Sequence, residues 1–135
     1  MSKGIYCIIT SLNKDTKIVF GKNKEEFFKK GFYCYVGSGM KDLEARIQRH
    51  LSEDKTKFWH IDYFLDHADI IGVKSIKTDD RIECKISRML KEMSDKTPVK
   101  GFGSSDCNCD THLHYFKENP LANEKFITIF DLKKF

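Results

Sequence analysis

The sequence predicts one α+β domain over residues 1–135, with a small, mainly antiparallel central sheet flanked by helices. Three observations favour this fold class: strand-like and helix-like segments are mixed along the chain, no repeat or linker composition divides them, and only two prolines interrupt it. A chain of 135 residues is also long enough to bury a core without disulfide or metal support.

Apolar segments in the first part of the chain predict three strands. Residues 4–12 (GIYCIITSL) indicate a buried strand, and residues 17–20 (KIVF) indicate a short second strand. After a charged connection, a third strand begins at Gly31 and ends where Gly37 and Gly39 break the pattern.

A helix is predicted to follow the third strand directly. It begins near Asp42, whose side chain suits an N-cap, and it ends at Leu51. Apolar side chains recur at every fourth position, at Leu43, Ile47 and Leu51. We expect this row to pack on the sheet.

The second half of the chain predicts two more helices and two more strands. Residues 58–67 (FWHIDYFLDH) indicate a short aromatic-rich helix, and residues 70–77 (IIGVKSIK) indicate a strand. Residues 79–93 predict a longer helix, and residues 124–130 (EKFITIF) predict the final strand. The residues of the longer helix that we expect to face inward are Ile82, Ile86, Met89 and Met93.

Charge and cysteine content limit the classes of function. The formal net charge of +4, from 24 basic and 20 acidic residues, is compatible with nucleic-acid binding but does not require it. No apolar stretch approaches the about 20 residues of a membrane-spanning helix, and the N-terminal apolar run is too short for a signal peptide. We therefore expect a cytoplasmic protein with no membrane contact, in which Cys7, Cys34 and Cys84 are small buried hydrophobes.

Three cationic or titratable side chains cluster on the helix that starts near Asp42. Arg46 and His50 are four residues apart and Arg49 is three residues from Arg46, so the three project from neighbouring rows. A solvated basic face is one interpretation. The other is an anion site, because the helix directly follows a strand and a guanidinium there can form paired hydrogen bonds with phosphate oxygens.

Tyrosines alternate along the first and third predicted strands. Alternation places Tyr6 on the same face as Gly4, and Tyr35 on the same face as Tyr33 and Gly37. Both phenols are either core aromatics or, where their hydroxyls converge near an arginine, groups that orient or deprotonate a water molecule.

Glu83 lies one step off the apolar row of the helix predicted over residues 79–93. A carboxylate near a helix N-terminus is favoured by the helix dipole, so a surface position is one interpretation. The alternative is that Glu83 points into a cleft and holds a magnesium ion that keeps most of its waters.

The order of these features resembles the signature of the GIY-YIG endonuclease superfamily. Gly4-Ile5-Tyr6 reproduces its first motif, and Tyr35-Val36-Gly37 resembles its second. The resemblance implies a GIY-YIG-like fold and a metal-dependent endonuclease that hydrolyses phosphodiester bonds in DNA, in repair or in the processing of structured DNA. The catalytic residues that it implies are Tyr6, Tyr35, Arg46, His50 and Glu83, with Glu83 holding Mg²⁺ or Mn²⁺.

A closer resemblance covers about residues 4–116. The strings FWHIDYFLDHA, RIECKISRML and GFGSSDCNCDTHLHYF are similar to a small GIY-YIG-like family whose domain occurs alone or fused to endonuclease III-type DNA glycosylases. This implies DNA as a partner and a functional association with a DNA glycosylase. The alternative is a catalytically inactive nucleic-acid-binding module of the same fold. The sequence indicates no oligomeric state.

The loop before His112 carries soft metal ligands and polar side chains. Cys107, Cys109, His112 and His114 offer thiolate and imidazole groups that suit zinc, although four ligands within one loop are cramped. A zinc-stabilised interaction domain is therefore a third alternative. We favour a polar loop that forms one wall of a cleft, in which the Asp106 side chain offers hydrogen bonds. A turn-rich surface loop is the remaining interpretation. The residues that we expect to contact substrate are Arg49, His60, Ser104, Ser105 and His112.

Overall fold

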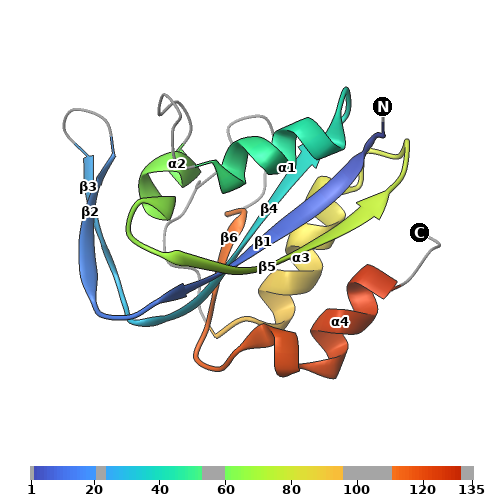
Figure 1. Ribbon diagram of the computed structural model, residues 1–135. Helices are drawn as coiled ribbons and strands as arrows, with labels where there is room; N and C mark the ends of the chain where they lie inside the picture. Colours follow the sequence, from blue (N-terminus) through green and yellow to red (C-terminus); the bar gives the residue numbers. More distant parts are fainter. Residues whose placement is uncertain (1, 21–23, 53–59, 96–110, 132–135) are drawn as a thin grey trace.

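Four antiparallel strands form the central sheet of the computed structural model, in the order β5-β1-β4-β6 (Figure 1). The structure describes residues 2–20, 24–52, 60–95 and 111–131. The elements are β1 (Gly4–Leu12), β2 (Thr16–Phe20), β3 (Lys24–Phe28), β4 (Gly31–Gly39), α1 (Leu43–Leu51), α2 (His60–Leu65), β5 (Asp69–Lys77), α3 (Glu83–Met93), β6 (Leu113–Phe116), the 3-10 turn η1 (Pro120–Ala122) and α4 (Glu124–Asp131). The predicted α+β class with a mainly antiparallel sheet is confirmed.

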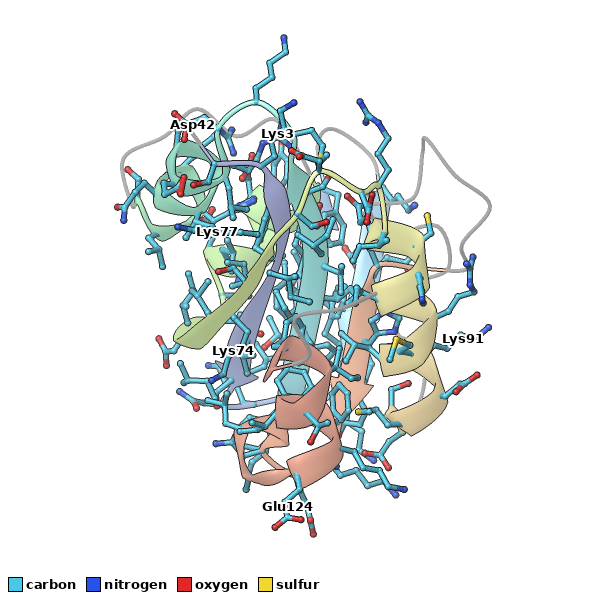
Figure 2. The ribbon with its side chains drawn as sticks, turned by 90° about the vertical axis from the view of Figure 1, so that its right-hand side faces the viewer. Lys3, Asp42, Lys74, Lys77, Lys91 and Glu124 are labelled. Atoms are coloured by element: carbon cyan, nitrogen blue, oxygen red, sulfur yellow. The ribbon has the colours of Figure 1, made fainter. Side chains whose placement is uncertain are left out.

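Both faces of the sheet are covered, which explains why every residue of β1 except one is buried. Successive side chains of a strand point to opposite faces. Ile5, Cys7 and Ile9 accordingly pack in the core with α3 and α4, whereas Tyr6 and Ile8 pack on the side of α1. Figure 2 shows α1 and α3 on opposite sides of the strands.

The hairpin of β2 and β3 stands beside the central sheet as a separate two-stranded sheet (Figure 1). Ile18 and Phe28 are fully buried in a core cluster with Phe64 of α2. The sequence predicted only a charged connection where β3 lies. Because the hairpin leaves the sheet, β1 and β4 still pair along their whole lengths, from Gly4 opposite Gly39 onward.

The predicted final strand over residues 124–130 is wrong, because this segment is helix α4. Phe126, Ile129 and Phe130 are buried at the i, i+3, i+4 spacing of a helix face, and they join the core under α3. The side chain of Asn123 accepts hydrogen bonds from the backbone N–H of Lys125 (2.9 Å) and Phe126 (3.3 Å), which caps the first turn. The last strand is β6, whose four residues are all buried.

Helix α1 begins as predicted, but its buried face is rotated relative to the predicted row. The Asp42 carboxylate accepts a hydrogen bond from the Ala45 N–H (3.1 Å). Leu43 and His50 are buried, whereas Leu51 is 41% exposed. Leu51 follows His50 by one residue, about 100° around the helix, so burying His50 turns Leu51 outward.

The remaining predicted elements match the structure. Helix α3 lies within its predicted segment, and β5 begins one residue before its predicted segment, at Asp69. Ile86 belongs to the core cluster on that side of the sheet, and Ile82, Met89 and Met93 are partly buried against it. Cys7 and Cys34 are buried and Cys84 is half-buried. Among the described residues, no helix is both long and apolar enough to cross a membrane.

Candidate active site

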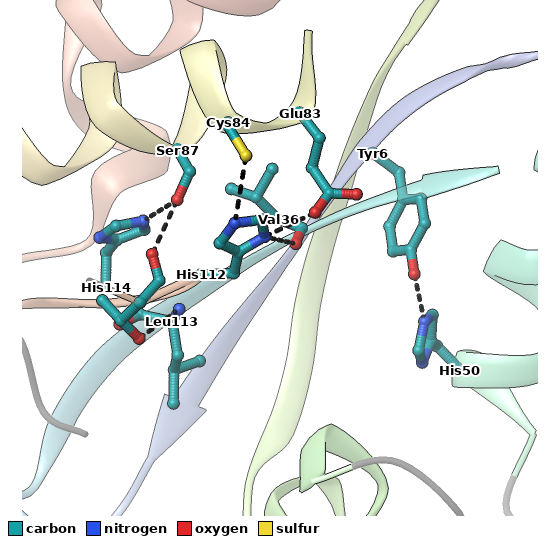
Figure 3. A network of polar contacts seen from close by, with 10 residues as sticks. Tyr6, Val36, His50, Glu83, Cys84, Ser87, His112, Leu113 and His114 are labelled. Atoms are coloured by element: carbon teal, nitrogen blue, oxygen red, sulfur yellow. Dashed lines mark hydrogen bonds and ion pairs between the residues drawn. The ribbon is translucent and has the colours of Figure 1, made fainter. Parts of the chain in front are cut away.

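Tyr6 of β1 and His50 of α1 meet in a buried hydrogen bond. The Tyr6 hydroxyl lies 2.5 Å from His50 Nε2, and each residue is 1% exposed (Figure 3). Burial is the main reason that the pKa of Tyr6 is raised far above its usual value. The phenol therefore keeps its proton, and its hydroxyl shares a hydrogen bond with Nε2 of the imidazole.

The glycines of the two sequence motifs make room for this arrangement. Gly37 lies directly opposite Tyr6 in the sheet, and a Cβ atom added to Gly37 would stand 2.5 Å from Cζ of Tyr6. A Cβ atom at Gly4 would overlap the backbone carbonyl of Ile76 on β5 and lie 3.0 Å from Leu43 on α1. Gly37 is thus required by the Tyr6 ring, and Gly4 by the close packing of β5.

Tyr35 of β4 lies beside the same pair. Its ring centroid is 6.5 Å from that of Tyr6 and 5.9 Å from that of His50. Burial raises the pKa of Tyr35, the Glu83 carboxylate raises it further, and the Arg46 guanidinium lowers it. Both phenols predicted from alternation therefore face one small volume.

Arg46 and Glu83 bring opposite charges to these phenols from opposite faces of the sheet. The charge and the hydrogen bond of Arg46 lower the pKa of Tyr6, whereas Glu83 raises it. Helix α1, which carries Arg46, starts shortly after the end of β4, and Glu83 contacts His112, whose carbonyl oxygen pairs with Val36 of β4, so both charged residues come from elements at the same end of the sheet.

The Glu83 carboxylate is held by His112, which immediately precedes β6. Oε2 of Glu83 lies 2.7 Å from Nδ1 of His112, whose side chain is fully buried, while the Glu83 side chain is 26% exposed (Figure 3). Nδ1 also lies 3.3 Å from the Val36 carbonyl oxygen, and Nε2 lies 3.9 Å from Cys84 Sγ.

The donor set at Glu83 fits a hard divalent ion. A partly exposed carboxylate is the kind of single protein ligand that Mg²⁺ or Mn²⁺ takes while it keeps several waters. In the described ranges, no three His, Cys, Asp or Glu side chains are grouped so that they could enclose a metal ion. Among the described residues, Glu83 is the carboxylate that would hold such an ion, without an all-protein cage around it.

Besides its hydrogen bond to Tyr6, His50 borders a pocket. It lines a pocket of 540 Å³ formed by the C-terminal ends of α1 and α2 and the start of β5. Asp66 and Asp69 contribute carboxylates to this pocket, and Leu65 and Ile70 contribute apolar surface.

A family model described as "Domain of unknown function DUF123" matches residues 5–134. The chain belongs to the DUF123 family. No curated protein and no solved structure matches it. The DUF123 description assigns no activity.

Among the residues expected to contact substrate, Arg49 of the DUF123 chain makes an ion pair within the fold. Its Nη1 and Nη2 atoms lie 2.9 and 3.0 Å from the two carboxylate oxygens of Asp62, which is fully buried. This paired contact ties α1 to α2, and Asp62 was not among the site residues predicted from the sequence. Contacts between residues 13 apart have no local sequence signal.

Several predicted site residues fall outside the described part of the DUF123 chain. His60 is the first residue of α2, but its side chain lies outside the description. The other predicted residues outside the described ranges are Ser104, Ser105, Asp106, Cys107 and Cys109. Substrate contact by these residues and a zinc site in this loop stay predictions.

A third buried histidine of the DUF123 chain, His114, was missed as a structural partner. His114 Nε2 lies 2.8 Å from Ser87 Oγ, which donates its proton to the Thr111 carbonyl oxygen (2.9 Å). The hydroxyl has one proton, so His114 must be the donor to Ser87. Burial, followed by the charge of His112, lowers the pKa of His114 to about 3. Ser87 follows Glu83 by about one helical turn, and this spacing is the sequence signal that could have pointed to Ser87 as a second contact between α3 and the sheet.

Proposed function

We propose that this DUF123 chain is a cytoplasmic, GIY-YIG-type endonuclease that uses a divalent metal to hydrolyse phosphodiester bonds in DNA. DNA repair or processing of structured DNA, in association with a DNA glycosylase, is the proposed setting. One observation supports the proposal above all others, namely the convergence at one end of the sheet of five side chains from β1, β4, α1 and α3. These are Tyr6, Tyr35, Arg46, His50 and Glu83.

Tyr6 and His50 supply a route for the proton of the attacking water. The raised pKa of Tyr6 means that a phenolate is not populated near neutral pH, so Tyr6 alone is a poor base. Tyr6 can instead take the water proton while its own proton passes to His50 Nε2, which its hydroxyl already contacts. His50 is in the last turn of α1, where the helix dipole favours an imidazolium ion.

Arg46 stabilises the negative charge that develops during this step. The water oxygen forms a bond to phosphorus as the bond to the leaving 3′ oxygen breaks, and charge builds on the non-bridging oxygens. A positioned donor of this kind contributes about 3 kcal/mol to the transition state. Glu83 would hold Mg²⁺ or Mn²⁺, which supplies Lewis-acid stabilisation of the phosphate charge when bound.

The proposal is tested by DNA cleavage with matched variants. Purified protein is incubated with branched, single-stranded and duplex DNA in Mg²⁺ or Mn²⁺, and the variants Glu83→Gln and Arg46→Ala are compared with Glu92→Gln and Arg88→Ala. The control residues are exposed and lie on α3, beyond its first turn. We expect a loss of about 10²–10³-fold in the first two variants only.

Equal cleavage by all four variants would assign the activity to another site or to a contaminant. The alternative function, a binding module without hydrolysis, predicts a different result. DNA would then bind, with salt-dependent affinity, and would stay intact in either metal with the unmodified chain.

A further inference from the structure

The Glu83 side chain is fixed by the sheet as well as by its own helix. Helix α3 starts without a side-chain N-cap, because Ile82 occupies the cap position and makes no capping hydrogen bond. The first residue of such a helix is weakly restrained by local structure. The short contact with His112 (2.7 Å) therefore determines the orientation of the Glu83 carboxylate.

The proton positions in this contact follow from the atoms around it. Nδ1 of His112 faces the Glu83 carboxylate oxygen and, at 3.3 Å, the Val36 carbonyl oxygen. A carbonyl oxygen and a carboxylate oxygen only accept hydrogen bonds, so Nδ1 carries the proton and donates it. Oε2 of Glu83 is the oxygen that receives it, so Oε1 is the oxygen that would bind a ligand.

His112 is itself held rigidly. Its side chain is fully buried, and its carbonyl oxygen accepts a hydrogen bond from the Val36 N–H (2.9 Å), which extends the pairing of β4 and β6 by one residue. The imidazole is thereby positioned by the same strand, β4, that carries Tyr35. The sheet thus sets the position of Glu83 relative to the phenols.

We propose that His112 is a positioning residue that orients the Glu83 carboxylate for a divalent ion, an inference that rests on the proposed function. A histidine that donates to a metal-binding carboxylate restricts the ligand to one orientation before the ion arrives. Loss of such an outer contact lowers metal affinity by about 10–100-fold in other proteins. His112 then acts through Glu83 and does not itself touch the substrate.

His114 provides a matched control within the same segment. It is fully buried like His112, lies two residues further along the strand on the same face, and contacts Ser87 one turn after Glu83 on α3. Substitution of either histidine removes a buried hydrogen bond between the sheet and α3. Only substitution of His112 removes a contact to the carboxylate.

The experiment measures Mn²⁺ affinity by isothermal titration calorimetry together with the melting temperature. We expect His112→Leu to weaken Mn²⁺ binding by about 10–100-fold, and we expect His114→Leu to lower the melting temperature without changing Mn²⁺ affinity. His112→Asn places an amide N–H near the Nδ1 position and restores part of the affinity, whereas His112→Gln places its amide near Nε2 and does not. The Asn and Gln pair decides the question if His112→Leu does not fold.

Each failure has a separate meaning. Unchanged Mn²⁺ affinity in Glu83→Gln would overturn the metal site of the proposed function. Loss of Mn²⁺ binding in Glu83→Gln, together with equal affinities of the His112→Asn and His112→Gln variants, would overturn the positioning role of His112 alone. Equal weakening by the substitutions at His112 and His114 would also overturn it, because a general loss of structure would then explain both.

Discussion

Replacing Gly37 with alanine should displace the Tyr6 phenol and break its bond to His50. The added Cβ would stand 2.5 Å from Tyr6 Cζ, and ordinary carbon contacts begin near 3.4 Å. The ring must therefore move by about 1 Å, since the backbone of β4 is held in register with β1 along its length. A movement of this size lengthens the 2.5 Å bond between Tyr6 and His50 beyond hydrogen-bonding distance.

The size of the effect follows from the loss of that bond. A buried hydroxyl without a partner costs about 1–3 kcal/mol, and a misplacement of about 1 Å in a reacting group costs about 10²-fold in rate. We expect Gly37→Ala to lower the free energy of unfolding by about 2 kcal/mol in urea denaturation and to lower DNA cleavage by about 100-fold.

Gly72→Ala is the matched control for this substitution. Gly72 is also a strand residue, in β5, but the nearest atom to its added Cβ is the end of the Leu121 side chain at 3.1 Å, which can move. We expect a small stability change and normal cleavage. If Gly37→Ala unfolds at the same urea concentration as the unmodified chain and cleaves DNA equally well, the steric account of Gly37 is wrong.

Four further predictions follow from the buried polar contacts. The pKa of His114 is lowered to about 3 in the folded chain, whereas the pKa of an unfolded histidine is about 6.5. Below about pH 6.5 the unfolded chain therefore binds a proton that the folded chain does not bind. The free energy of unfolding falls as the pH is lowered from about 6.5 to about 3. Between pH 7.5 and pH 4.5, urea denaturation should show a loss of stability that is about 3 kcal/mol smaller in His114→Gln than in the unmodified chain. Asp62→Asn should lower stability by about 3 kcal/mol by urea denaturation, because it breaks a buried ion pair. Arg49→Ala should affect stability more than DNA affinity measured by fluorescence anisotropy, and the reverse would support the predicted substrate role of Arg49. His50→Gly should lose cleavage and regain part of it with added imidazole, because the 540 Å³ pocket then opens toward the phenol; no recovery at any imidazole concentration would argue against His50 as the proton acceptor.

Alternation and motif order were sufficient to predict where the two phenols lie. Tyr6 and Tyr35 each follow from the period of two along a strand, and the antiparallel pairing of β1 and β4 brings them to one face. The apolar periodicity of helix α1 was less informative at the C-terminal end of that helix. It could not distinguish Leu51 from His50 as the buried residue, because that choice depends on a partner 44 residues away in the sequence.

Two other features depended on tertiary contacts. The segment 124–130 combines β-branched residues with an apolar spacing that also suits a helix, and packing against α3 together with the Asn123 cap decides between them. The strand β3 (KEEFF) is too charged to be recognised from its own sequence, since it is stabilised by pairing with β2. The contact between Glu83 and His112 spans 29 positions and has no local signal.

The β2–β3 hairpin has a consequence for recognising distant relatives of this chain. It adds its residues outside the sheet, so the number of residues separating the two tyrosine motifs is free to vary without moving either tyrosine. A search that demands a fixed interval between the motifs would overlook chains of this kind. The pairing of a glycine on one strand with an aromatic ring on its neighbour is the constraint that such a search should keep.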